Sequence, residues 1–200
     1  MMALNPPRAL NPPLRLGLRM AYCAVSAALE QDEIAAQSAA CFNAPSAAHP
    51  DSAMQLIIFT GIQASGKSTF YQSYFYSTHL RINLDMLKTR HRESMIFEAA
   101  LASKTRMVID NTNPDREARA RYMQRAKQAG FAVIAYYFDT DLSSALARNR
   151  QRQGKANIPE AGVRAAYKKL QMPSLDEGFD EIFQVRIAGN GGFSIHPLGA

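Results

Sequence analysis

Cysteine and histidine are scarce in this chain of 200 residues, which contains two cysteines and four histidines. Cys23 and Cys41 match no metal-binding spacing, and a single pair cannot form the framework of a disulfide-stabilised fold. The histidines are scattered along the sequence, which argues against a zinc site. These absences favour a protein of the reducing cytoplasm.

Long apolar stretches are absent too. No run approaches the roughly 18 to 20 apolar residues that a membrane-spanning helix requires, so we expect no membrane contact. Acidic residues are outnumbered by basic ones, 17 to 23, which gives a net charge of +6. This balance favours an anionic partner such as a nucleotide, a nucleic acid or another phosphorylated molecule. Nothing in the sequence indicates an obligate protein partner.

Residues 1–53 offer few side chains that could form a core. They contain two Asn-Pro-Pro repeats and Ala- and Ser-rich text, so we predict a disordered extension. Two alternatives stay open: three arginines precede the first acidic residue, Glu30, as in a targeting peptide, or translation starts at Met54. The remainder divides into a folded domain, 54–187, and a glycine-rich loose tail, 188–200.

From residue 55 onward, apolar runs typical of buried strands alternate with segments of helical character. Asn113 is expected to cap a helix that begins at the following proline. Strands that alternate with helices of this length form a parallel sheet with helices on both faces, so the predicted fold class is α/β. The predicted strands are 55–60, 81–83, 106–109, 131–138 and 181–187, and the predicted helices are 67–76, 86–103, 114–130, 142–152 and 160–170.

The segment GIQASGKST, residues 61–69, lies between the first strand and the first helix. It matches the phosphate-binding pattern G-x-x-x-x-G-K-[ST]. The glycines permit positive φ angles, so that successive main-chain N–H groups surround phosphate oxygens at the start of the helix. We therefore expect ATP and Mg²⁺ as cofactors, bound by Gly61, Ala64, Ser65, Gly66, Lys67, Ser68 and Thr69.

The residues around this loop indicate what happens to the γ-phosphate. We expect Lys67 to reach the β- and γ-phosphates, and Ser68 and Asp110 to serve the Mg²⁺ ion. Asn111 stands where ATP-hydrolysing motors commonly have a glutamate that polarises water. No Asn-Lys-x-Asp motif for guanine occurs either. The pattern favours phosphate transfer over hydrolysis.

A kinase also needs a carboxylate that accepts the proton of the attacking hydroxyl. Asp85 follows the second predicted strand, at the sheet edge that would face the phosphate loop. The same position suits an N-cap of the helix that begins at Met86, so both roles stay open from position alone.

Similarity to a known family is carried by five segments: GIQASGKSTF, RINLDMLK, VIDNTNPDREARARYMQRAKQAG, RNRQRQGK and PSLDEGFDEI. Together they resemble the kinase domain of polynucleotide 5′-hydroxyl kinases and their small bacterial relatives, over residues 54–187. The phosphate loop is common to many families, whereas IDNTNPDREARARY is much more specific. The resemblance implies a P-loop kinase fold with a helical lid, and transfer of the ATP γ-phosphate to the 5′-hydroxyl of DNA or RNA.

The resemblance also implies roles for individual residues. The segment RNRQRQ would be the lid, whose arginine steadies the transferring phosphates, and both of its outer arginines suit that role. The implied site consists of Asp85 as general base, Lys67 with Arg148 or Arg152 at the phosphates, and Lys88, Asp110 and Asn113 at the acceptor.

Two positions depart from the family pattern. Members often have arginine where this chain has Leu84 and Lys88, and the second arginine holds a phosphate of the acceptor strand. Lysine supplies charge without the two-pronged geometry of a guanidinium. A kinase for a nucleoside or a phosphorylated metabolite therefore stays open, as does a nucleotide-dependent switch with slow turnover. Arg81, Arg90 and Arg92, which flank the expected base, are further candidates for holding an anionic acceptor.

Overall fold

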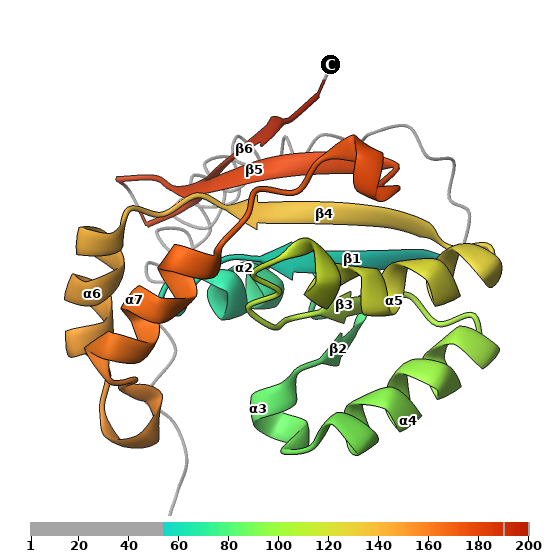
Figure 1. The fold of residues 1–200 in the computed structure, drawn as a ribbon, viewed down its shortest axis with the longest axis horizontal. Helices are drawn as coiled ribbons and strands as arrows, with labels where there is room; N and C mark the ends of the chain where they lie inside the picture. The colour runs from blue at the N-terminus through green and yellow to red at the C-terminus, as the bar shows by residue number, and fades with distance from the viewer. Residues whose placement is uncertain (1–53, 190, 200) are drawn as a thin grey trace, which may run out of the picture. The chain divides into compact units, whose positions relative to one another are not determined.

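Six strands form one sheet in the computed structural model, which describes residues 54–189 and 191–199. The predictions for residues 1–53 lie outside the described residues. None of the described helices has both the length and the apolar character that a membrane crossing needs. The predicted α/β class, with a mainly parallel sheet and helices on both faces, is confirmed (Figure 1).

The first strand occupies the middle of the sheet. The strands are β1 (Gln55–Thr60), β2 (Leu80–Ile82), β3 (Met107–Ile109), β4 (Ala132–Phe138), β5 (Glu181–Ile187) and β6 (Phe193–Pro197). Their order across the sheet is β2-β3-β1-β4-β5-β6, and every neighbouring pair is parallel except β5 and β6. Ile57 of β1 lies opposite Val108 of β3 and Ile134 of β4. This crossover order places the carboxyl ends of the parallel strands at one edge, where α/β proteins bind their ligands.

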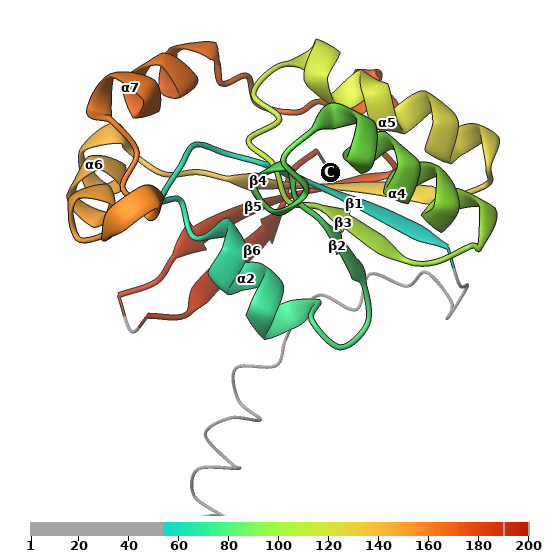
Figure 2. The same cartoon turned by 90° about the horizontal axis from the view of Figure 1, so that it is seen from below.

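Helices cover both faces of this sheet. They are α2 (Lys67–Tyr74), α3 (Leu84–Leu87), α4 (Arg90–Ala102), α5 (Arg116–Gln128), α6 (Leu142–Arg150) and α7 (Glu160–Lys169), with 3₁₀ turns η1 (Gly154–Ala156) and η2 (Leu175–Glu177). α2 lies on one face and α4 and α5 lie on the other (Figure 2). α6 and α7 pack on each other through Ala145 and Val163, beyond the carboxyl ends of β1 and β4 (Figure 1).

Alternate residues of β1 enter two separate apolar layers. Leu56 and Ile58 are buried beneath α4 and α5. Ile57 and Phe59 are buried against α2, where the ring centroids of Phe59 and Phe70 are 5.8 Å apart. Burial of a side chain of this size stabilises the fold by about 1.5–3 kcal/mol. A strand anchored on both faces holds the loop that follows it in a fixed place.

The single helix predicted at 86–103 is wrong, because the chain forms α3 and α4 instead. Lys88 ends α3 with φ 70°, and Thr89 begins α4 by accepting a hydrogen bond from the Arg92 N–H. A lysine rarely adopts this left-handed conformation, so local preference predicts an uninterrupted helix. The break gives the short helix α3 a direction independent of α4.

The predicted cap of α5 is wrong as well. Asp115 is the N-cap, and its side chain accepts from the main-chain N–H of Ala118 at 2.8 Å. Asn113 has φ 41°, and its side-chain amide donates to the carbonyl oxygen of Phe59 at 2.8 Å. Asn113 therefore fastens the loop after β3 to the end of β1.

The predicted loose tail at 188–200 contains an ordered strand. β6 pairs antiparallel with β5, and the ring of Phe193 packs edge-on against Phe70 of α2, with centroids 5.0 Å apart. An added Cβ at Gly66 would lie 3.0 Å from Cε1 of Phe193, so the strand also backs the loop before α2. The segment was predicted to be loose because of its glycines, but these belong to a turn that includes Gly191 at φ 82°.

Candidate active site

A cavity of about 220 Å³ lies at the carboxyl ends of the parallel strands. Its walls come from the loop after β1, the turn α3, the end of β3 and the segment after α6. The residues around it include Gly66, Lys67, Ser68, Asp85, Asp110 and Arg152. The fold thus brings together most of the residues that the sequence singled out.

The loop between β1 and α2 has the main-chain shape of a phosphate cradle. Ala64 and Gly66 have φ angles of 59° and 95°, which turn successive N–H groups toward one side. Gly66 is the N-cap of α2 and provides no side-chain acceptor for the first N–H groups of the helix. Those donors and the helix dipole favour an anion. Gly61 is required by space, because an added Cβ would lie 2.8 Å from Cβ of Phe138.

Lys67 reaches back across this loop. Its Nζ donates to the carbonyl oxygens of Gly61, at 2.8 Å, and Ile62, at 2.5 Å. Burial desolvates the ammonium and lowers the pKa of Lys67 to about 8, while the charge of Asp110 opposes that shift. The side chain is therefore mostly charged at neutral pH and lies beside the loop amides.

Ser68 and Asp110 are close enough to share one metal ion. The Ser68 Oγ donates to Oδ2 of Asp110 at 3.3 Å. Mg²⁺ in nucleotide sites usually takes one or two protein oxygens and completes its shell with phosphates and water. In the part of the chain that the structure describes, no cluster of three or more His, Cys, Asp or Glu side chains could hold a metal unaided. The donor set fits Mg²⁺ that arrives with a nucleotide.

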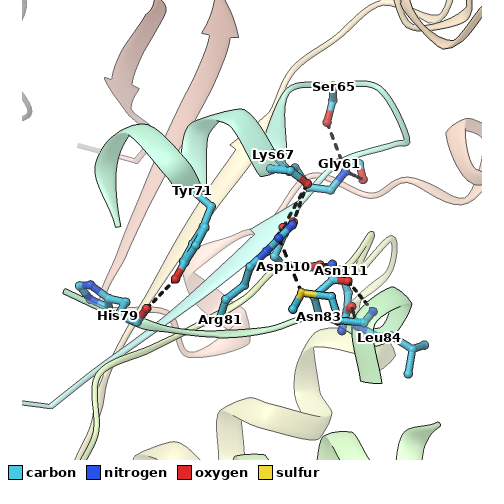
Figure 3. A network of polar contacts seen from close by, with 12 residues as sticks. Gly61, Ser65, Lys67, Tyr71, His79, Arg81, Asn83, Leu84, Asp110 and Asn111 are labelled. Carbon is cyan, nitrogen blue, oxygen red and sulfur yellow. Dashed lines mark hydrogen bonds and ion pairs between the residues drawn. The ribbon is translucent and has the colours of Figure 1, made fainter. Parts of the chain in front are cut away.

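Arg81 makes a contact that the sequence did not reveal. Its guanidinium forms an ion pair with Asp110 (Figure 3). Nε donates to Oδ2 of Asp110 at 2.9 Å, and Nη2 donates to Oγ of Ser68 at 2.8 Å. The two paired residues are 29 positions apart in sequence, so no local pattern connects them.

Asp85 lies exposed in the first turn of α3 and borders the cavity. Asn83 is the N-cap of this helix, and its Oδ1 accepts from the main-chain N–H of Met86 at 3.1 Å. The alternative that Asp85 is the cap is therefore wrong. Its carboxylate has no capping task and remains the predicted general base.

A buried polar network fixes the turn that carries Asp85. Oδ1 of Asn111 accepts from the Leu84 N–H at 2.8 Å, and Nδ2 of Asn111 donates to Oε1 of Glu93 at 2.5 Å (Figure 3 shows Asn111 beside Leu84). Oη of Tyr122 donates to the same carboxylate at 3.0 Å. Glu93 is 3% exposed, which strengthens these bonds. Neither Glu93 nor Tyr122 was predicted from the sequence. Asn111 was noted only because ATP-hydrolysing motors commonly have a glutamate at its position.

The two candidate lid arginines occupy different places. Arg152 borders the same cavity as Lys67. Arg148 lines a neighbouring cavity of about 340 Å³, and its Nε donates to the carbonyl oxygen of Ala64 at 2.8 Å. Burial lowers the pKa of Arg148. This geometry favours Arg152 as the phosphate contact and Arg148 as a support of the loop.

Two predicted acceptor residues have other contacts. Lys88 is not among the residues that line the cavity, and its Nζ donates to the carbonyl oxygen of Asp85. Asn113 lines the cavity but is 4% exposed, and its amide is bonded to the end of β1. Met86, next to Asp85, is 64% exposed. The surroundings of Asp85 therefore include an exposed apolar neighbour, while Arg90, which pairs with Glu93, also lines the cavity.

Comparison with known proteins adds a family and its relatives. A family model described as an AAA domain matches residues 56–173. One relative is the bifunctional polynucleotide phosphatase/kinase of Schizosaccharomyces pombe, 28% identical over 137 residues, covering 66% of this chain and 33% of that protein. Another is the L-seryl-tRNA(Sec) kinase of Methanococcus maripaludis, 24% identical over 144 residues, covering 62% of this chain and 56% of that protein. The chain spans about a third of the first relative's length and just over half of the second's.

A solved structure shares the fold. Kti12 from Chaetomium thermophilum, solved in complex with ADP-AlF3, matches with a TM-score of 0.52 at 14% identity, covering 68% of this chain and 92% of that chain. Identity this low shows a common fold alone. The family match and the phosphatase/kinase relative confirm the resemblance to polynucleotide kinases that the sequence indicated.

Proposed function

The chain belongs to the AAA domain family, and from its site and its kinase relatives we propose that it is an ATP-dependent kinase that transfers the γ-phosphate to a hydroxyl acceptor. The preferred acceptor is the 5′-hydroxyl of a polynucleotide. One observation carries this proposal: Asp85 borders the same cavity as Lys67 and Ser68 of the phosphate loop. A base and a phosphate cradle that share one cavity are what a direct transfer requires.

The donor would be held by the loop and the lid. Main-chain N–H groups around Gly66 would bind the phosphates, with Lys67 and Arg152 neutralising the charge that develops on the transferring group. Ser68 and Asp110 would hold Mg²⁺, which would supply positive charge to offset the charge on the phosphates. The protein supplies positioning and charge, which account for most catalysis of phosphoryl transfer.

The acceptor would approach from the α3 side. Asp85 accepts the hydroxyl proton as the acceptor oxygen forms a bond to the γ-phosphorus, and the bond from that phosphorus to the β,γ-bridging oxygen breaks. ADP leaves with the bonding electrons. The phosphatase/kinase relative and the positive net charge support a polynucleotide as acceptor. A cytoplasmic location, where ATP and Mg²⁺ are available, belongs to this proposal.

A second candidate is a kinase for a smaller or different hydroxyl substrate. Leu84 and Lys88 provide no guanidinium for an acceptor phosphate, and one relative is named for a different acceptor, an L-seryl-tRNA. A slow nucleotide switch is less well supported, because Asp85 stands free beside the phosphate loop.

Transfer of labelled phosphate separates these candidates. The full chain is incubated with Mg²⁺, ATP labelled at the γ-phosphate, and a panel of 5′-hydroxyl oligonucleotides of RNA and DNA, nucleosides, sugars and seryl-tRNA. Label on oligonucleotides supports the preferred acceptor. Label confined to another member of the panel selects the second candidate. Binding of ATP without any labelled acceptor would favour the switch.

A further inference from the structure

The guanidinium of Arg81 contacts both Ser68 and Asp110 (Figure 3 shows Arg81 against Asp110). Nε and Nη2 both donate to Oδ2 of Asp110, and Nη2 also donates to the Ser68 hydroxyl. The same Oδ2 accepts from Ser68. The carboxylate oxygen nearest the serine therefore has its acceptor capacity taken up by this arginine and the hydroxyl.

These two oxygens are the ones that fit Mg²⁺. The side chain of Asp110 is 1% exposed, and the Arg81 guanidinium is one of the groups that cover its Oδ2. An arginine and a divalent cation that share one carboxylate oxygen at such distances repel each other and compete for the same lone pairs. Mg²⁺ bound at these two oxygens would therefore compete with Arg81.

The other contacts of Arg81 are weak. Its guanidinium carbon lies 5.3 Å from the centroid of the Tyr71 ring, and Nη1 lies 3.8 Å from Sδ of Met86. Neither neighbour carries a charge that would retain the arginine. The Arg81 side chain is 23% exposed, which leaves it a way out toward solvent. The ion pair with Asp110 is therefore the main hold on this side chain.

We propose that Arg81 is an internal stand-in for Mg²⁺, a positioning residue that holds Ser68 and Asp110 until the metal arrives with the nucleotide and displaces it. The inference rests on the proposed binding of ATP with Mg²⁺. In the nucleotide-free protein, the guanidinium neutralises a carboxylate whose isolated burial would be unfavourable. Because it competes with the ion, Mg²⁺ alone binds weakly, and Mg²⁺ that is also held by phosphates binds well. Arg81 thus couples occupancy of the metal site to the nucleotide.

The test is a Mg²⁺ titration of nucleotide binding in full-length protein. Arg81→Met removes the competing charge, and Arg81→Lys keeps the charge but loses the forked geometry. Arg125→Met is the matched control, because Arg125 pairs with Glu98 on the outer surface at 2.6 Å. Binding of a fluorescent ATP analogue is followed as Mg²⁺ is raised. We expect the Mg²⁺ midpoint to fall about three- to tenfold in Arg81→Met, and less in Arg81→Lys.

Thermal melting supplies a second readout. Without ligand, Arg81→Met should melt at a lower temperature than wild type, and Mg²⁺ with ATP should raise its melting temperature by more than it raises that of Arg125→Met. If Arg81→Met does not fold, the midpoint of Arg81→Lys decides.

The outcomes separate the two proposals. Wild-type protein that binds no nucleotide at any Mg²⁺ concentration would overturn the proposed function and this inference together. Wild-type protein that binds with Mg²⁺, with an unchanged or higher midpoint in the Arg81 variants, would overturn the inference alone, because the arginine would then remain beside the metal.

Discussion

The phosphate loop and the turn α3 face one cavity but are built in opposite ways. The loop is held by main-chain geometry, with Ser65 1% exposed and Ile62 fully buried. α3 is four residues long, has no buried residue, and presents Asp85 and Met86 to solvent. One region would recognise its ligand through backbone amides, and the other through exposed side chains.

This difference separates what the protein binds from what it modifies. A main-chain cradle tolerates few substitutions, because its shape depends on glycine and on packing beneath it. Exposed side chains on a short turn can be exchanged without disturbing the core. Binding of the donor therefore depends on the main-chain fold, whereas the choice of acceptor depends on a few side chains around Asp85.

The largest effect is expected from Asp85→Asn. Phosphate transfer should fall by about 10²- to 10⁴-fold, because the amide cannot accept the hydroxyl proton. Affinity for ATP should change less than about twofold, since the side chain lies on the acceptor side. Transfer of γ-label and binding of a fluorescent ATP analogue are measured on the same preparation. A variant that keeps its transfer rate would remove Asp85 from the mechanism.

Gly61→Ala tests the other region. The new Cβ would lie 2.8 Å from Cβ of Phe138 and 3.0 Å from Oγ of Ser65, so the loop must shift. Overpacking of about 1–3 kcal/mol corresponds to roughly a 5- to 150-fold loss of ATP affinity. Gly162→Ala on α7 is the control, because its nearest neighbour is 3.4 Å away and its helical backbone accepts alanine. Equal ATP binding by both variants would show that the loop is less rigid than we infer.

Asn111→Ala addresses the connection between the two regions. Loss of its bonds to Leu84 and Glu93 should loosen α3 and lower kcat by about tenfold, with ATP affinity unchanged. Tyr122→Phe, which removes one bond to Glu93 and keeps the ring, should lower kcat by only about two- to threefold. Transfer rates at saturating ATP are compared with melting temperatures. A parallel loss of ATP binding would mean that Asn111 serves the whole site and not α3.

The smallest effect is expected from Lys88→Arg. A guanidinium at this position offers two-pronged contact to a phosphate, so KM for a phosphate-bearing acceptor should fall about two- to fivefold, with kcat and ATP affinity unchanged. The measurement compares an oligonucleotide with a nucleoside that lacks phosphate. If both acceptors respond alike, Lys88 does not contact an acceptor phosphate.

The donor half of this comparison was largely predictable from sequence. β1 is a short apolar run that is readily recognised as a buried strand. The loop after it needs glycine where φ is positive or space is lacking, so the positions of its glycines predict its main-chain conformation. Lys67 and Ser68 follow from that pattern, and Asp110 follows from its place at the end of an apolar strand. The structure places all three around one cavity. Alternation of strands and helices likewise predicted the sheet.

The remaining features depend on contacts between distant residues. The pairing of Arg81 with Asp110, and of Asn111 with Glu93, arises only when the strands meet at the sheet edge. The break at Lys88 depends on a conformation that lysine seldom adopts alone. β6 was missed because its apolar side chains are few and its partners lie in α2 and β5. The conformational preferences of neighbouring residues predict neither these distant contacts, nor the break at Lys88, nor the strand β6.

The hairpin of β5 and β6 has a practical consequence for handling the protein. Phe193 lies against α2 and close to Gly66, so the final strand props the nucleotide loop from behind. Trimming the chain after Ile187 would remove that prop while leaving every motif residue intact. Recombinant versions are better fused through a flexible spacer beyond the hairpin than shortened to the last apparent motif.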